Sequence, residues 1–307
     1  MQWGQIKLLF ILSFLILDLF LLQQFLSKEA EDELGQISTV AESVETELQE
    51  NDIEVKEGAI PDDLPEASEI VSSSDNSFSD EIMSQIEEID DSNQQIEFDE
   101  DRQVVKVTLD EPIEVTEDTL QDKVDSLIPF SSQYSYWGWN EEEGAAIYFQ
   151  AVDNQTVYFN KRGSMLVNIK DNEITGYVAS LLSFSEDDST VNEFSQSDVD
   201  LEPLNAIRTL LENGLIQPGD EVTSMDIGYH TSFDLAPGEE NGSQVFTSTW
   251  KVTVNGERNH FVYALYGTVI ENIDEASFIS DIKRTHNFED TVSEQTSLNK
   301  NRNNETN

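Results

Sequence analysis

A single apolar stretch near the N-terminus constrains the fold of this chain more than any other feature. From Leu8 to Leu22 the sequence reads LLFILSFLILDLFLL, and Phe25 and Leu26 extend it after two glutamines. A helix needs about 20 predominantly apolar residues to cross the hydrocarbon core of a bilayer. Residues 8–26 have about this length, so they predict a transmembrane helix within the lipid bilayer of the cell membrane.

The residues that follow favour an uncleaved anchor over a cleaved signal peptide. A signal peptide ends at a cleavage site of the small-x-small type, but if Ala30 ended it, Lys28 would occupy a position that needs a small side chain. Lys7 precedes the apolar stretch, whereas acidic residues dominate after Lys28. The positive-inside rule therefore places residues 1–7 in the cytoplasm and the chain from residue 27 outside the cell.

Asp18 places a carboxyl group within the predicted membrane helix. Such a group costs about 2.5–3.5 kcal/mol to insert near the bilayer centre. One interpretation is a polar contact with another transmembrane helix, and the other is a tolerated carboxylate that is protonated or displaced toward the outer interface. At helical spacing, Asp18 shares one face with apolar residues. This candidate partner-binding face consists of Ile11, Phe14, Leu15, Asp18, Leu22 and Phe25; the alternative is that the stripe faces lipid.

The charge of the chain excludes one class of partner. The sequence has 16 Lys+Arg against 63 Asp+Glu, which gives a formal net charge of −47. Proteins bind nucleic acid through cationic surfaces that release counterions, so no nucleic acid partner is expected. The chain also has no cysteine, which removes disulfides, thiolate metal sites and thiol nucleophiles.

The remaining sequence predicts an α+β fold. After the transmembrane helix we expect an extracytoplasmic domain of two modules, each with a helix packed on an antiparallel sheet. Amphipathic helical spacing adjoins β-rich runs in each module, and Asn255-Gly256 predicts a tight hairpin in the second. The predicted order is an acidic juxtamembrane helix and linker over residues 27–94, a first module over 95–184, a linker over 185–200, a second module over 201–283 and a disordered tail over 284–307.

Patterns that carry catalysis or bind metals are weak in this sequence. It contains no nucleophile elbow, zinc-protease motif or phosphate-binding loop, so we expect no catalytic residues and a protein that is not an enzyme. Alternating acids such as Asp99 and Asp101 lack the glycine and terminal glutamate of a calcium loop. His230, His260 and His286 would have to converge from two strands and the tail. We therefore expect no metal and no cofactor.

An aromatic group in the first module has two interpretations. Tyr134, Tyr136, Trp137 and Trp139 lie on a predicted strand, whose alternation places both tyrosines with Gly138 on one face and both tryptophans on the other. Such rings can stack on sugars or peptides. Packing in the core and at the sheet edge is the favoured interpretation.

Several segments together resemble one known family. They are Trp3, Ile6-Lys7, Phe10–Leu15, Leu17–Phe20 and Gln24-Phe25 near the N-terminus, then Glu45–Ile53, Tyr134–Gly138, Val157–Lys161 and Tyr263–Val269. These segments resemble the YycI (WalI) family of accessory membrane proteins of Gram-positive bacteria.

The resemblance implies a function that composition and spacing do not. It implies a non-catalytic regulator of a YycG/WalK-like sensor histidine kinase that controls cell-wall homeostasis. Such a regulator acts with a YycH-like anchored protein through transmembrane and ectodomain contacts. One alternative is an anchored surface binding module for a wall fragment, peptide or protease. Another is a surface hydrolase that uses carboxylates.

Overall fold

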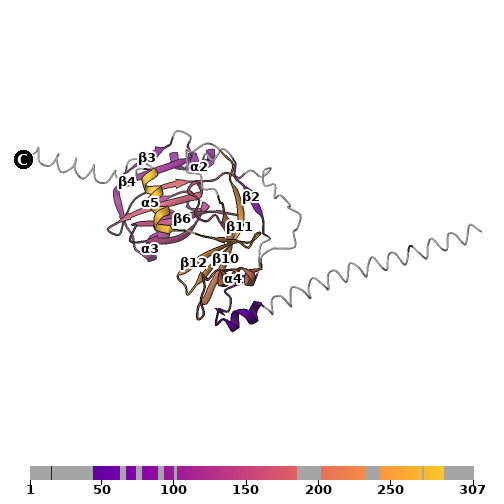
Figure 1. Cartoon of the computed structure of the whole chain (residues 1–307). Helices are drawn as coiled ribbons and strands as arrows, with labels where there is room; N and C mark the ends of the chain where they lie inside the picture. Colours follow the sequence, from indigo (N-terminus) through magenta and orange to yellow (C-terminus); the bar gives the residue numbers. More distant parts are fainter. Residues whose placement is uncertain are drawn as a thin grey trace, which may run out of the picture.

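Two sheets and a small number of helices make up the described part of the chain (Figure 1). The computed structural model describes residues 15, 44–62, 67–73, 78–88, 93–99, 102–184, 202–232, 242–271 and 273–286. Most neighbouring strands run antiparallel, which confirms the expected α+β class. Apart from Leu15, the predicted transmembrane helix over residues 8–26 lies outside the described residues.

The first sheet is built almost entirely from the middle of the chain, and all its described pairings are antiparallel. Across the sheet, the strands are β3 (Gln94–Phe98), β4 (Val104–Glu114), β9 (Glu173–Ser180), β8 (Ser164–Lys170), β6 (Ala145–Val152) and β5 (Tyr134–Asn140), and β7 (Gln155–Thr156) pairs with β6. Two short 3₁₀ helices, η2 (Ser131–Gln133) and η3 (Lys161–Gly163), lead into β5 and β8.

Helices cover both faces of the first sheet. Helices α2 (Asp80–Glu87) and α3 (Glu117–Leu127) pack on one face, and α5 (Glu275–Thr285) packs on the other (Figure 1). Successive residues of β8 alternate between the two cores: Met165 belongs to the core under α2 and α3, and Leu166 to the core under α5. A strand buried on both faces favours a continuous apolar run, such as Ala145–Phe149 of β6.

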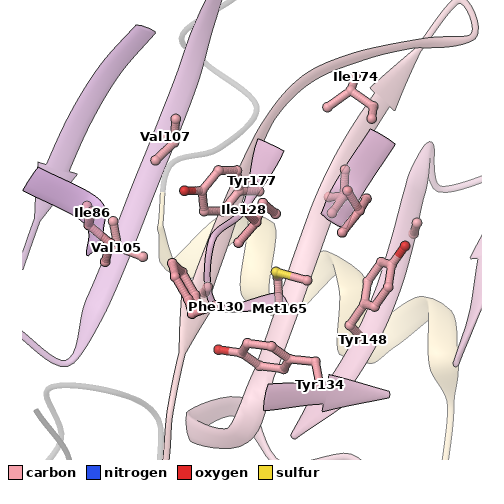
Figure 2. Packing of buried hydrophobic residues seen from close by; sticks show 14 of the residues in the cluster. Ile86, Val105, Val107, Ile128, Phe130, Tyr134, Tyr148, Met165, Ile174 and Tyr177 are labelled. Atoms are coloured by element: carbon pink, nitrogen blue, oxygen red, sulfur yellow. The ribbon is translucent and has the colours of Figure 1, made fainter. Parts of the chain in front are cut away.

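Aromatic rings fill much of the core under α2 and α3. Figure 2 shows Phe130, Tyr134 and Tyr177 gathered around Met165. The ring centroid of Phe130 lies 6.3 Å from that of Tyr134 and 6.4 Å from that of Tyr177. Tilted and edge-to-face pairs at this separation are the favoured arrangement of aromatic side chains. The Tyr134 hydroxyl donates to the carbonyl oxygen of Ser180 at 2.9 Å, which satisfies its polar end inside the core.

The second sheet contains one parallel pairing, between β1 and β10, and is otherwise antiparallel in its described part. Across the sheet, the strands are β1 (Glu54–Val55), β10 (Glu221–His230), β11 (Val245–Val254), β12 (Arg258–Tyr263) and β13 (Val269–Ile270), and β2 (Glu69–Val71) pairs with β11. The hairpin between β11 and β12 turns at Asn255-Gly256, as expected, with φ values of 54° and 74°.

One face of the second sheet is covered by α4 (Pro203–Glu212) and by helical residues 44–50. Pro203 lies at the first turn of α4, where its missing N–H costs no helix hydrogen bond. Gly214 follows the helix with a φ of 70°, a conformation that favours glycine. The spacing of Ala206, Ile207 and Leu210 therefore produces the predicted amphipathic helix, with these residues buried on the sheet.

The sheets are assembled across the predicted boundaries in two places. Strands β1 and β2 lie within residues 27–94, predicted as a juxtamembrane helix and linker, yet both pair in the second sheet. Helix α5 follows the second sheet in sequence but buries Phe278, Ile279 and Ile282 on the first. Helix α5 packs there because the first sheet has a second apolar face, which a segment from elsewhere in the chain must bury. The linker over 185–200 lies outside the described residues, and the predicted boundaries stay predictions.

The segment after β7 links the two sheets. The amide of Val157 donates to the carbonyl oxygen of Gln150 in β6, and Val157 also forms a parallel bridge with Tyr229 of the second sheet. Helix α5 continues through Thr285, with its apolar face packed on the first sheet. The predicted start of the tail at residue 284 stays a prediction.

Candidate functional site

The predicted partner-binding face lies almost wholly outside the described residues. Of Ile11, Phe14, Leu15, Asp18, Leu22 and Phe25, the structure describes Leu15, which is helical and has 53% of its surface exposed. Within the described ranges, no helix is both long enough and apolar enough to span a membrane. The transmembrane face therefore stays a prediction.

The described helix nearest to the predicted anchor in sequence, residues 44–50, is tightly bound to the second sheet. Val44 and Leu48 have 1% and 2% of their surfaces exposed and belong to the same core as α4. The chain then turns at Asn51 and enters β1, where the amide of Glu54 donates to the carbonyl oxygen of Asp220. Apolar burial and backbone hydrogen bonds thus both attach residues 44–54 to the second sheet.

A groove borders this helix. Its volume is about 580 Å³, and it combines apolar side chains with carboxylates and a glutamine. The lining residues include Leu48, Gln49, Ile53, Ile60 and Leu204. The groove thus lies between the helix, β1 and the start of α4.

A second, smaller cavity of about 270 Å³ lies where the two sheets meet. The first sheet contributes Trp137 and Phe149, and the second contributes Asp226, Ile227 and Lys251. At this junction the amide of Tyr158 donates to the carbonyl oxygen of Tyr229 at 2.8 Å. The cavity is therefore formed by both sheets and depends on their packing.

The aromatic group on β5 is divided between the two faces of the first sheet. A register shift between Tyr136 and Gly138 interrupts its pairing with β6. As a result, Trp139 packs against the core that contains Tyr134, whereas Trp137 packs against the core under α5. The expectation that both tryptophans share one face is wrong, because a β-bulge changes the alternation.

Trp137 joins three parts of the molecule. Its ring centroid lies 5.3 Å from that of Phe149 and 6.2 Å from that of Phe261 in β12. Its indole N–H donates to the carboxylate of Glu275 in α5 at 2.8 Å. The ammonium group of Lys251 lies 5.6 Å from the ring centroid and forms a 2.7 Å ion pair with Asp226. Core packing, the favoured interpretation of this aromatic group, therefore applies to Trp137.

The histidines lie in separate settings. His230 on β10 contacts the hydroxyl of Tyr263 through Nδ1 at 2.9 Å, and burial lowers its pKa to about 4. Burial also lowers the pKa of His260 on β12 and of His286 at the end of α5. Among the described residues, no group of three or more potential ligand side chains is arranged to hold a metal ion.

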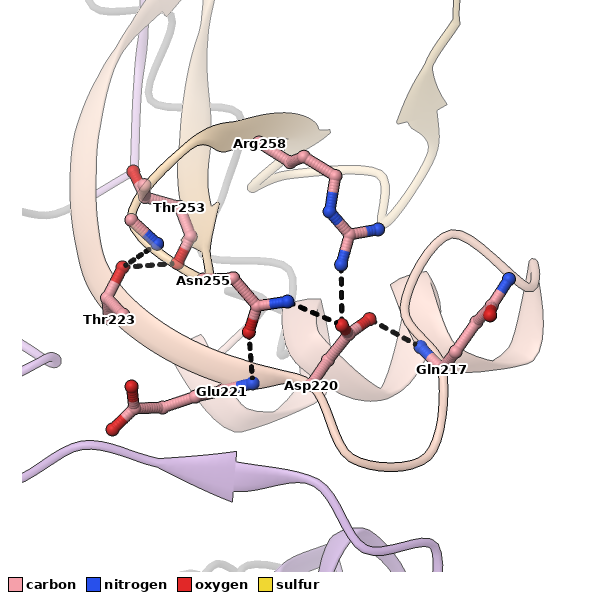
Figure 3. A network of polar contacts seen from close by, with 8 residues as sticks. Gln217, Asp220, Glu221, Thr223, Thr253, Asn255 and Arg258 are labelled. Carbon is pink, nitrogen blue, oxygen red and sulfur yellow. Dashed lines mark hydrogen bonds and ion pairs between the residues drawn. The ribbon is translucent and has the colours of Figure 1, made fainter.

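At least one acidic side chain of the second sheet has a structural role. Asp220 accepts hydrogen bonds from Arg258 at 2.6 Å, from the Asn255 amide group at 2.7 Å and from the Gln217 backbone at 2.8 Å (Figure 3). The hydrogen bond from Arg258 is the main cause that lowers the pKa of Asp220. This network fixes the start of β10 to the turn between β11 and β12.

These features define an α+β protein of two packed sheets, in which Val44 and Leu48 of the helical residues 44–50 belong to the core of the second sheet. The model of one family, described as YycI protein, matches residues 32–265. Because this match covers most of the sequence, the chain belongs to the YycI family.

The other comparisons were made with curated sequences and with solved structures. No curated protein sequence matches the chain. The crystal structure of YycH from Bacillus subtilis aligns with a TM-score of 0.34 and 9% sequence identity, over 66% of this chain and 53% of that chain. The chain thus spans about half the length of that protein.

Proposed function

We propose that this protein is a membrane-anchored, extracytoplasmic regulator of a YycG/WalK-like sensor histidine kinase. In this proposal it acts without catalysis and together with a YycH-like anchored protein. Residues 1–7 lie in the cytoplasm, residues 8–26 cross the membrane and the two sheets lie outside. The match of the YycI family model to residues 32–265 is the observation that carries this proposal.

The burial of residues 44–50 supports a route for the signal. A regulator whose folded sheets lie outside the cell acts on the kinase through its membrane helix or its ectodomain. Since Val44 and Leu48 are buried with α4, a displacement of the second sheet would move the segment that leads toward the anchor. The contacts that shift the kinase between its two states would then include the predicted membrane-helix face that contains Asp18.

The size of the regulatory effect is bounded by thermodynamics. The protein can shift the kinase equilibrium only by the difference between its affinities for the two kinase states. Coupling free energies of about 1–3 kcal/mol are typical for such systems. The proposal therefore requires a modest differential contact and no chemical step on the regulator.

Crosslinking in native membranes tests the proposal. The full-length protein is crosslinked, and its partners are identified by mass spectrometry. One variant has Ile11, Phe14, Leu15, Asp18, Leu22 and Phe25 replaced by leucine where they are not leucine already. A matched control has only the other residues of the 8–26 stretch replaced.

We expect the native chain and the matched control to recover a sensor kinase and a second anchored protein, and the face variant to lose them. Recovery of neither partner by the native chain would contradict the proposal. Recovery of wall material with every anchor would favour the surface binding module.

A further inference from the structure

Strand β1 is an edge strand, since β10 is its neighbour among the described strands and none lies on its other side. The amide of Glu54 donates to the carbonyl oxygen of Asp220 at 3.1 Å. The amide of Lys56 donates to the carbonyl oxygen of Val222 at 3.0 Å. Backbone groups alternate in direction along a strand, so the N–H and C=O of Val55 point away from β10. No hydrogen bond between described residues uses either group, and this edge of β1 can therefore pair with a further strand.

The free edge of β1 forms one wall of the groove beside the helical residues 44–50. The groove has a volume of about 580 Å³, and both Glu54 and Val55 line it. Val55, Ile60 and Leu204 are only partly buried against the core of the second sheet, so they also give the groove an apolar lining. Helix 44–50, drawn in indigo, lies beside α4 in Figure 1. An extended segment in the groove could thus form backbone hydrogen bonds with Val55 and bury apolar side chains.

The groove also carries negative charge that the chain itself does not neutralise. Its lining includes the exposed residues Glu45, Asp52 and Glu54. No ion pair between described residues involves any of these three carboxylates. Glu54 also lies in register with Glu221 of β10, which places two like charges side by side. A basic side chain beside Glu54 would relieve this repulsion.

The basic residues around the groove have other positions or partners. Lys56 follows β1 but is not among the described residues that line the groove. Arg258 pairs with Asp220 at 2.6 Å (Figure 3), and Arg208 pairs with Glu212 at 3.8 Å. The carboxylates of the groove are therefore available to a cation from another molecule.

The register of β1 sets the order of side chains that an added strand should have. Val55 pairs with the buried Val222, so its side chain faces the core of the second sheet. Glu54 faces the opposite side, because successive side chains of a strand alternate. On an added strand, the residue beside Val55 would contact the apolar lining, and the residues before and after it would lie on the side of Glu54. The best match is a strand in which apolar and basic residues alternate.

We infer that this groove binds an extended segment of a partner protein, in which lysine or arginine alternates with apolar residues, and that the segment adds to β1 as a further strand. A second copy of this chain is a poor occupant, because each copy has a formal net charge of −47 and the two would repel. The inference does not depend on a kinase as the partner.

Peptide binding to the full-length protein in nanodiscs of neutral phosphatidylcholine tests this inference. The probe is a fluorescent peptide in which three arginines alternate with two valines. One counterpart has the same side chains but N-methyl groups on its internal amides, which removes the backbone donors and keeps the charge. A second counterpart has glutamate in place of each arginine. Binding is measured by fluorescence anisotropy at fixed ionic strength.

The protein variants separate the backbone contribution from the contributions of side chain and charge. Val55→Pro removes the outward N–H and leaves the bonds of β1 to β10 intact, whereas Val55→Ala keeps that N–H. Glu54→Gln removes one charge of the groove. Its matched control is Glu142→Gln, at an exposed glutamate in the turn between β5 and β6 of the first sheet.

The arginine–valine peptide should bind more tightly than either counterpart. Val55→Pro should weaken its binding by about two- to ten-fold relative to Val55→Ala, as expected for loss of one net hydrogen bond. Glu54→Gln should weaken binding by about 1.5- to five-fold, as expected for loss of an exposed ion pair. Glu142→Gln should leave binding unchanged.

Equal binding of the arginine–valine peptide and its N-methylated counterpart would overturn the inference, because it would indicate attraction by overall charge alone. Failure of the arginine–valine peptide to bind would also overturn it, as would self-association of the chain in its place. Near-ultraviolet circular dichroism checks that each variant remains folded. If Val55→Pro does not fold, the two peptides and Glu54→Gln decide the question. A chain that binds the peptide as expected but recovers no kinase on crosslinking would retain this inference and contradict only the proposed function.

Discussion

The ammonium group of Lys251 in the second sheet lies 5.6 Å from the ring centroid of Trp137 in the first. The same indole donates to Glu275 in α5, so Trp137 contacts both sheets and the helix that follows them. A cation–π contact of this kind contributes about 0.5–2 kcal/mol, depending on solvent access. The relative placement of the two sheets is thus fixed by specific side-chain contacts as well as by apolar burial.

Gly228→Ala should destabilise the junction between the sheets. A Cβ atom at this position would overlap the carbonyl oxygen of Thr156 and the ring of Tyr158. We expect the free energy of unfolding to fall by about 1–3 kcal/mol, as for other overpacked sites. Urea denaturation of the full chain in mild detergent measures this change. Gly138→Ala is the control, since a Cβ atom added there would meet nothing within 4 Å, and an equal loss in both variants would contradict the explanation.

Leu48→Ala should weaken the attachment of residues 44–50 to the second sheet. Its side chain is 2% exposed, and truncating a buried leucine costs about 2–5 kcal/mol. Thermal unfolding of the full chain measures the loss, with exposed Glu50→Ala as the control. If the signal passes through this helix, Leu48→Ala should also reduce kinase regulation when the protein remains folded. A stability equal to that of the control would contradict the observed packing.

Asp220→Asn should lower stability at neutral pH and have a smaller effect in acid. The folded-state pKa of Asp220 lies below the ordinary value of 3.8, mainly because Arg258 donates to its carboxylate. The stabilisation is therefore present above pH 4 and is lost as the pH falls through the folded-state pKa. Denaturation of native protein and variant between pH 7 and pH 2 tests this expectation. A stability difference that does not vary with pH would contradict it.

His230→Phe should reduce the loss of stability between pH 6.5 and pH 4. The folded-state pKa of His230 is lowered from 6.5 to about 4 by burial, so the unfolded chain binds the proton more readily in this range. Stability is lost as the pH falls below the unfolded-state value, by an amount on the order of 3 kcal/mol at pH 4. Parallel thermal unfolding curves measure the two pH profiles. Profiles of identical slope would show that His230 does not contribute.

Much of the local structure could be predicted because its causes are local. Helix α2 begins after Ser79, whose hydroxyl accepts the amide of Ile82, and α3 begins after Thr116, which forms a capping box with Thr119. Asn255-Gly256 sets its hairpin through backbone conformation alone. Capping, apolar spacing and turn residues are all visible in a short window of sequence.

The structural features that could not be predicted from the sequence depend on contacts between segments far apart in the chain. Helix α5 has a local signal, since Asp274 accepts the amide of Ser277 and Phe278, Ile279 and Ile282 share a face. No local pattern indicates that this face belongs to the first sheet. Similarly, β2 is a strand only because β11 provides its hydrogen bonds.

The cavity between the sheets could not be predicted from sequence spacing. Trp137 and Lys251 are far apart in the chain and meet only when the two sheets pack. The bulge that separates the faces of Trp137 and Trp139 also has no clear sequence signal apart from Gly138. The sequence indicated the aromatic group on β5, but it did not indicate that Asp226 and Lys251 would line the same cavity as Trp137.

Kinase autophosphorylation in proteoliposomes tests the central claim most directly. A YycG/WalK-like kinase and a YycH-like protein are reconstituted with the native chain, with the leucine-substituted face variant or with the matched anchor control. We predict that the native chain and the control change the level of phosphorylated kinase by about five- to 150-fold, the range that corresponds to typical coupling, and that the face variant does not. Equal phosphorylation with and without the native chain would contradict the account.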